Sequence, residues 1–123
     1  MNHPNFVLLY VANPTASATF YADLLGSQAV EASPTFAMFA LDNGVMLGLW
    51  ASQTVEPKAA VGAGGSELAF AMADDAAVEA CYSEWEAKGI VIAQTPTRMD
   101  FGFTFVGLDP DGHRLRVFSP SQP

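Results

Sequence analysis

Short runs of apolar residues, separated by polar and turn-forming residues, divide the first half of the chain. Such runs predict strands, here at residues 6–11, near Val30, at 36–41 and at 45–51. After the first strand, Asn13-Pro14 provides a favourable N-cap and first helical residue, and Gly26 provides a C-terminal stop. Asn43-Gly44 is a strong hairpin signal between the last two strands. The predicted order is therefore one strand, one helix and three strands.

The same order returns in the second half of the chain. Residues 52–65, rich in Ala, Gly, Pro and polar side chains, are predicted to be a linker. Strands follow at 67–72 and 90–93, with a helix from Asp74-Asp75 to Lys88-Gly89 and a closing hairpin at 99–118. Residues 6–24 align with 67–85 without a gap, which indicates an internal repeat. The prediction is an α+β chain of two βαβββ modules, 1–51 and 66–119, within one domain of residues 1–123.

The closing hairpin combines aromatic and basic residues in an unusual way. Its two strands are joined by a predicted turn at Asp109-Pro110-Asp111-Gly112. If Leu108 pairs with His113, Phe105 faces Arg116 and Phe103 faces Phe118, because cross-strand partners share a face. That face would carry Met99, Phe101, Phe103, Phe105, Arg114, Arg116 and Phe118. We interpret it as the wall of a cavity.

The first module adds further rings by the same alternation. The predicted inward residues are Phe6, Leu8 and Tyr10 on the first strand, and Met46, Gly48 and Trp50 on the fourth. Gly48 is expected to open a space beside Trp50 that a ring could enter. A mostly apolar pocket with a few polar groups suits a small planar aromatic compound. Rings on strands also form cores and dimer interfaces, and that alternative stays open.

Charge and composition exclude several classes of partner. Thirteen acidic against five basic residues give a net charge of −8, which disfavours nucleic acids and anionic membranes as partners. No run approaches the roughly 18–20 apolar residues of a membrane span, and the start of the sequence lacks the pattern of a secretion signal. With Cys81 as the single cysteine, no disulfide framework is expected. A cytoplasmic protein is the expectation.

Several motifs resemble a known superfamily. Phe20-Tyr21, Leu24-Leu25-Gly26 and the ending from Asp109 to His113 resemble the vicinal oxygen chelate proteins, which include glyoxalase I, extradiol dioxygenases and bleomycin- or fosfomycin-resistance proteins. The resemblance implies curved, mostly antiparallel sheets that form a cupped cavity, with the helices outside. It also implies a homodimer, in which modules are sometimes exchanged between chains.

The metal positions of that superfamily are not retained. Its enzymes hold a divalent ion with His, Gln or Glu from the first and last strands of each module, which correspond here to Phe6, roughly Gly48, Glu67 and Arg116. Only Glu67 could be a ligand, whereas three or four ligands are the norm. We therefore predict no metal, no cofactor and no catalytic residue, and expect Glu67 and Arg116 to converge as an ion pair.

Within the superfamily, the chain resembles the phenazine-antibiotic resistance proteins in particular. Residues 45–50, Ser66-Glu67 and the stretch from Asp109 to Val117 resemble their fourth, fifth and last strands. Those proteins bind the antibiotic between aromatic side chains without transforming it, which implies a metal-free sequestering protein here. The expected ligand contacts are Phe6, Tyr10, Met46, Gly48, Trp50, Glu67, Phe101, Phe103, Phe105, Arg116 and Phe118. The alternatives are a glyoxalase- or dioxygenase-like enzyme, or an aromatic face that serves only as a dimer interface.

Overall fold

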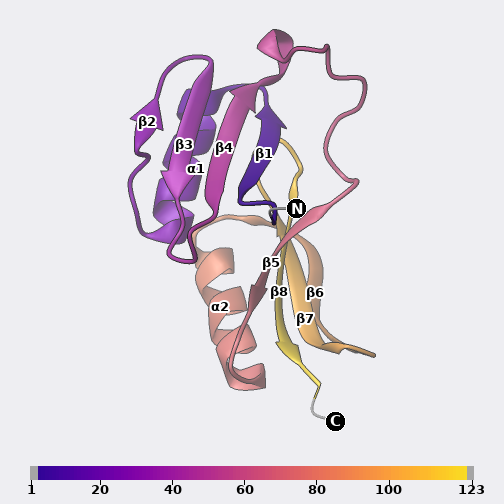
Figure 1. The fold of residues 1–123 in the computed structure, drawn as a ribbon. Coiled ribbons are helices and arrows are strands. Elements are labelled where there is room, and N and C mark those ends of the chain that lie inside the picture. Colours follow the sequence, from indigo (N-terminus) through magenta and orange to yellow (C-terminus); the bar gives the residue numbers. More distant parts are fainter. Residues whose placement is uncertain (1–2, 122–123) are drawn as a thin grey trace. The chain divides into compact units, whose positions relative to one another are not determined.

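The computed structural model describes residues 3–121 and contains two copies of one succession of elements (Figure 1). The first copy comprises β1 (Phe6–Val11), α1 (Pro14–Leu25), β2 (Glu31–Ala32), β3 (Phe36–Ala40) and β4 (Met46–Ala51), followed by the 3-10 helix η1 (Ser52–Thr54). The second comprises β5 (Glu67–Ala71), α2 (Asp75–Ala87), β6 (Val91–Met99), β7 (Gly102–Leu108) and β8 (Arg114–Pro120). The predicted α+β class and the repeated βαβββ order are confirmed.

Each copy forms one four-stranded sheet, with strand orders β1-β4-β3-β2 and β5-β8-β7-β6. The pairs β1–β4 and β5–β8 are parallel, and the other neighbours are antiparallel. The first and last strands of each module are therefore adjacent, so residues about 40 to 50 positions apart in sequence share one face.

The chain divides into two compact units, residues 1–62 and 63–123. The boundary falls inside the predicted linker, but η1 and the buried Val55 belong to the first unit. The exact extent of the modules, and their description as one domain, stay predictions. None of the helices among residues 3–121 is long and apolar enough to cross a membrane.

Local sequence explains the first helix. The Asn13 side chain accepts a hydrogen bond from the Ala16 amide at 3.2 Å, Pro14 occupies the first turn, and Gly26 ends the helix in a left-handed conformation. These three features are the predicted ones. The helix packs on β3 and β4, and fully buried residues of the unit's core include Tyr21, Phe39, Leu47 and Leu49.

The second helix packs on its sheet through aromatic rings. Asp74 caps α2 by accepting a hydrogen bond from the Ala77 amide at 2.8 Å. Trp85 and Tyr82 contact the Phe105 ring edge-to-face, with centroid distances of 5.1 and 5.4 Å. A Cβ at Gly107 would lie 2.9 Å from the Trp85 indole, so glycine permits this close approach.

Strand β6 is longer than predicted. It runs to Met99, past the predicted end at residue 93, and Asp100 and Phe101 form the turn to β7. Irregular pairing with β7 between Ile92 and Gln94, and again between Gln94 and Thr97, breaks the period of two on which the prediction depended. Pro96 is compatible with β6 because this strand lies at the edge of the sheet.

The register of the closing hairpin also differs from the prediction. Leu108 pairs with Arg114, not with His113. The loop is one residue longer than assumed, because the Asp109 Oδ1 atom accepts hydrogen bonds from the amides of both Asp111 and His113, each at 2.9 Å. A shift of one residue moves every side chain of a strand to the opposite face.

Phe103 and Phe105 are therefore misplaced in the sequence-based prediction. They pair with Ser119 and Val117, on the face that α2 covers. Phe105 is fully buried against the rings of that helix, and the guanidinium of Arg98 lies 5.1 Å from the centroid of the Phe103 ring. Neither phenylalanine lies on the predicted cavity wall.

Candidate functional site

The first unit displays a set of rings on the sheet face opposite its core. The β1–β4 register places Phe6 beside Met46, Leu8 beside Gly48 and Tyr10 beside Trp50. Strand β3 adds Phe36 beside Trp50 and Met38 beside Gly48. We call this set the aromatic face; its members are Phe6, Leu8, Tyr10, Phe36, Met38, Met46, Gly48 and Trp50. The sequence analysis did not include Phe36 and Met38, although the alternation along residues 36–41 could have indicated both.

The aromatic face is unusually exposed for its composition. Phe6, Leu8 and Tyr10 are 43%, 45% and 40% exposed, whereas Leu9 and Val11, which point to the opposite face of the strand, are buried. Tyr10 and Trp50 meet edge-to-face, with ring centroids 6.2 Å apart. Contiguous exposed apolar surface of this kind is typical of binding sites and interfaces.

Gly48 does not open the predicted space beside Trp50. A Cβ at this position would lie 2.7 Å from Leu8 Cδ2 and 3.0 Å from both Phe36 Cζ and Phe6 Cε1. The side chains of those three residues already occupy the volume above the glycine. The volume at Gly48 is therefore filled, and the accessible part of this face is the outer surface of these side chains.

The second unit carries the predicted ion pair. Arg116 Nε donates to Glu67 Oε1 at 2.7 Å, and Nη2 donates to Oε2 at 3.0 Å. Arg114 lies farther away, with Nη1 3.6 Å from Glu67 Oε2. The hydrogen bonds from Arg116, together with the charges of Arg116 and Arg114, hold the pKa of Glu67 below its ordinary value despite an opposing contribution from burial. Glu67 is thus held as the carboxylate.

Arg116 is also fixed by other groups on the same face. Its Nη1 atom donates to Gln94 Oε1 and to Thr104 Oγ1, each at 3.2 Å. We call Glu67, Gln94, Thr104 and Arg116 the polar network. Sequence reasoning missed Gln94 and Thr104, because neither residue type marks a site by itself and the irregular pairing of β6 hides the position of Gln94.

Aromatic rings lie next to the polar network. The Arg116 guanidinium lies 5.7 Å from the centroid of the Phe101 ring, and Phe101 contacts Phe118 at a centroid distance of 6.0 Å. Phe101 and Phe118 therefore accompany Arg116 as predicted, and Phe101 is 44% exposed. This part of the second unit combines a fixed cation with two rings.

The donor set at the superfamily's metal positions does not fit a metal. Phe6 and Gly48 provide no ligand atom, Arg116 is a permanent cation, and both oxygens of Glu67 accept hydrogen bonds from Arg116. Among residues 3–121, no three His, Cys, Asp or Glu side chains lie close enough together to hold an ion.

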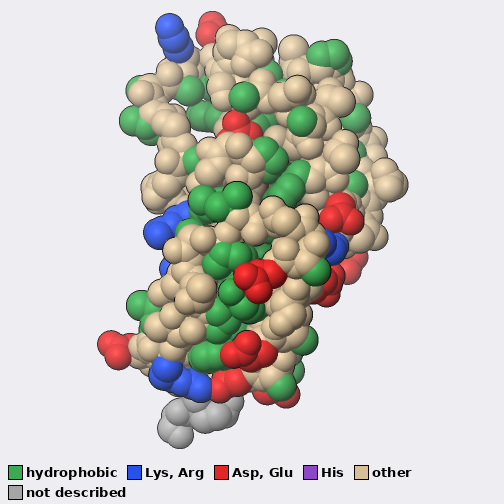
Figure 2. Space-filling view, turned by 180° about the vertical axis from the view of Figure 1, so that it is seen from behind, with side chains coloured by type: hydrophobic (Ala, Val, Ile, Leu, Met, Phe, Trp, Pro, Cys, Tyr) green, Lys and Arg blue, Asp and Glu red, His purple; other side chains and the backbone are tan. Residues whose placement is uncertain are grey.

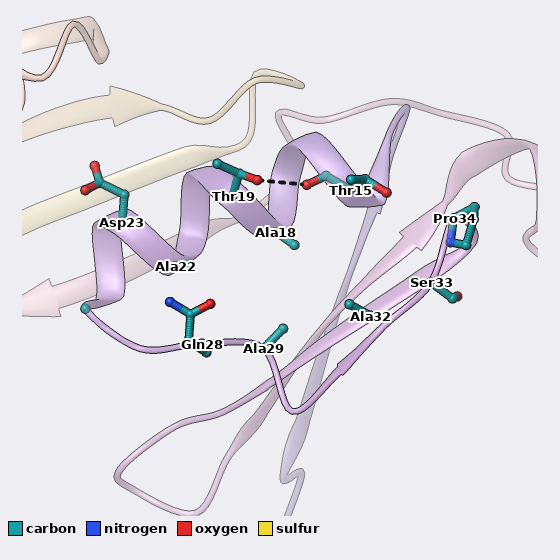
Figure 3. A pocket seen from close by; sticks show the side chains of 11 residues that line it. Thr15, Ala18, Thr19, Ala22, Asp23, Gln28, Ala29, Ala32, Ser33 and Pro34 are labelled. Carbon is teal, nitrogen blue, oxygen red and sulfur yellow. Dashed lines mark hydrogen bonds between the residues drawn. The ribbon is translucent and has the colours of Figure 1, made fainter.

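A separate groove lies on the first unit between α1 and the chain that leads into and past β2 (Figure 3). Its volume is about 890 Å³, and its lining consists mainly of small or polar residues such as Ala18, Ala22, Gln28 and Ala29. It includes no predicted site residue, and Asp23 is the one charged residue of its lining. We place the candidate site on the aromatic face instead, where large rings gather.

The two βαβββ modules agree with a comparison of the sequence with known families. The chain matches the Glyoxalase/Bleomycin resistance protein/Dioxygenase superfamily over residues 3–117. It belongs to this superfamily. The predicted resemblance to the vicinal oxygen chelate proteins is thereby confirmed.

Individual proteins are similar to this chain in sequence, in structure or in both. The phenazine antibiotic resistance protein EhpR of Enterobacter agglomerans is 30% identical over 117 residues, which cover 93% of this chain and 89% of that protein. A solution NMR structure of an Agrobacterium tumefaciens protein is 52% identical, with a TM-score of 0.91 and coverage of 99% of this chain and 100% of the other. A glyoxalase-related enzyme from Fulvimarina pelagi shares the fold, with 21% identity, a TM-score of 0.82 and coverage of 97% and 88%.

Proposed function

We propose that this protein is a metal-free binding protein that sequesters a planar aromatic compound, such as a phenazine-like antibiotic, on its aromatic face. The observation that carries the proposal is the exposed cluster around Tyr10 and Trp50, whose rings meet 6.2 Å apart. The relative EhpR, a phenazine antibiotic resistance protein, supports the same ligand class. Resistance would then result from binding alone.

Ring geometry supports a flat ligand. A polycyclic compound placed against Trp50 and its neighbours gains stacking and edge contacts of about 0.5–1.5 kcal/mol each beyond the area that it buries. Phe6, Leu8 and Tyr10 are each at least 40% exposed. Ligand binding would remove part of their apolar surface from water, which favours the complex. Two or three such contacts add about 1–4.5 kcal/mol to the contribution of the buried apolar area.

The electrostatics of Glu67 support binding over acid–base catalysis. A general base for neutral pH needs a pKa near the working pH. The hydrogen bonds and charge of Arg116 instead hold the pKa of Glu67 below its ordinary range, which makes its carboxylate a weak base. The polar network is better suited to fixing one conformation of the sheet face of the second unit.

A titration with phenazine, followed by tryptophan fluorescence and by calorimetry, tests the proposal. We expect saturable quenching and a stoichiometric heat of binding, with the phenazine recovered unchanged. Metal analysis of the same purified sample separates the alternatives, since a superfamily enzyme of the metal-dependent kind would carry near-stoichiometric metal. Absence of binding across a panel of tricyclic aromatics would overturn the proposal.

The expected homodimer and cytoplasmic location belong to this proposal as well. If the aromatic face served only as a dimer contact, adding phenazine would either leave the protein unaffected or dissociate the dimer. Light scattering at increasing phenazine concentration distinguishes these cases. Our proposal predicts a dimer whose mass changes only by that of the bound ligand.

A further inference from the structure

Lys58 differs from the other cations of the chain in its lack of an acidic partner. Lys88 pairs with Glu84, Arg98 with Asp75, and both Arg114 and Arg116 with Glu67. Within residues 3–121, Lys58 forms no ion pair and no hydrogen bond. It is also the only Lys or Arg among residues 1–62. The single positive side chain of the first unit is therefore available to an anion.

Lys58 lines a groove that shares Tyr10 with the aromatic face. The groove has a volume of about 600 Å³ and lies between the end of β1, η1 and residues 55–62. Tyr10 lines the same groove and is also a member of the aromatic face, where its ring contacts Trp50. The volume is within the range of small-molecule sites, roughly 300–1,000 Å³. Gln53 adds an amide to the lining.

We infer that the ligand of the aromatic face is an anionic planar aromatic, and that Lys58 binds its carboxylate in this groove. The inference rests on the proposed function and specifies its ligand class. The rings lie against Trp50 and Tyr10, and the carboxylate extends past Tyr10 into the groove. The ammonium group of lysine offers three hydrogen-bond donors and a compact charge, and charge-assisted bonds of this kind are about twice as strong as neutral ones.

The surrounding charges make this contact selective. The chain has a net charge of −8, and Figure 2 shows more acidic than basic side chains on the face that it draws. Glu56 lines the same groove as Lys58 and opposes an anion there. An anionic ligand is therefore repelled by most of the surface and is bound where Lys58 provides a local positive charge.

Phenazine-1-carboxylate and phenazine-1-carboxamide form a matched pair of probes, because the two differ in charge but scarcely in shape. Calorimetry with the wild-type chain is expected to show about tenfold tighter binding of the carboxylate, the equivalent of one good charge-assisted contact. Lys58→Gln should abolish this preference and leave carboxamide binding unchanged. Lys58→Arg should retain most of it.

Two further variants control for long-range charge. Lys88→Gln removes the same charge from α2 of the second unit and should leave the carboxylate preference at its wild-type value. Glu56→Gln removes the opposing carboxylate of the groove and should strengthen carboxylate binding a few-fold, with no effect on the carboxamide.

The outcomes separate the inference from the function on which it rests. If both probes bind equally and Lys58→Gln changes neither affinity, the inference is overturned and the proposed function stands. If Lys58→Gln and Lys88→Gln reduce the preference equally, the effect is one of net charge and the inference is likewise overturned. If neither probe binds, both the proposed function and the inference fail.

Discussion

Arg116 and Glu67 form a two-pronged ion pair, with N–O distances of 2.7 and 3.0 Å. The pair lies on neighbouring parallel strands, and its side chains are only 17% and 27% exposed. Such shielding makes the pair more important to stability than a surface salt bridge, because a lone charge left behind is poorly solvated.

Removal of one partner is therefore expected to destabilise the protein. Glu67→Gln should lower the free energy of unfolding by about 1–3 kcal/mol, since Arg116 loses its charged acceptor. Urea denaturation measures this loss. Lys88→Gln, which removes the more exposed pair with Glu84, should cost at most about 0.5 kcal/mol. Equal losses for the two variants would contradict the assigned role of the Arg116 pair.

The ion pair also predicts how stability depends on pH. Arg116 lowers the pKa of Glu67 in the folded chain below its ordinary value of 4.5, so below that value the unfolded chain binds more protons than the folded one. The stability contributed by this group is present above 4.5 and is lost as the pH falls through the folded pKa. The difference in unfolding free energy between wild type and Glu67→Gln should therefore shrink from pH 6 to pH 3. A constant difference would contradict this assignment. Asp75, whose pKa is lowered by Ser119 and Arg98, contributes equally to both curves.

Trp50 should dominate ligand affinity. Trp50→Ala is expected to weaken phenazine binding about tenfold, the equivalent of one good aromatic contact, while Trp50→Phe should retain part of the affinity. Calorimetry is the suitable measurement because it does not depend on tryptophan emission. Trp85→Phe provides the control: Trp85 packs on Phe105 in the core of the second unit, so this change should alter stability and leave affinity intact. The same loss of affinity in Trp85→Phe would show that the effect is not local to the aromatic face.

Two glycines should respond very differently to substitution by alanine. Gly102 has a φ of 151°, and a Cβ there would lie 2.0 Å from the Ser119 carbonyl oxygen, so Gly102→Ala should cost about 3–5 kcal/mol. At Gly48 the nearest atom is the flexible end of the half-exposed Leu8 side chain, at 2.7 Å. Gly48→Ala should cost only about 1 kcal/mol, and thermal unfolding compares the two. Similar losses would indicate that the aromatic face is as rigid as the backbone around Gly102.

Local signals in the sequence were sufficient to predict most of the fold. The Asn13 cap, the Gly26 stop and the period of two in β1 and β4 each depend on neighbouring residues alone, and all three are present in the structure. The convergence of Glu67 with Arg116 was also predicted, because the resemblance to the vicinal oxygen chelate proteins placed both residues at positions whose side chains meet at one metal ion.

The errors arose where the strand register or the space beside a residue depends on side-chain conformations that the sequence does not reveal. The side chain of Asp109 lengthens the last hairpin loop by one residue, and this shift moves Phe103 and Phe105 to the helix face. At Gly48 the sequence suggested vacant space, but the orientations of Phe6 and Phe36, which no local pattern specifies, fill it. The ligand contacts themselves stay predictions.

The two parallel ladders have one further consequence. Phe6 and Glu67 begin equivalent strands, and Gly48 and Arg116 occupy equivalent positions on their partners. The same backbone arrangement thus carries the aromatic face in the first unit and the polar network in the second. Main-chain hydrogen bonds pair the strands in both units and do not depend on these side chains. The exposed face of each sheet can therefore change in sequence while the pairing is kept, which makes the repeated module suitable for redesigning ligand specificity.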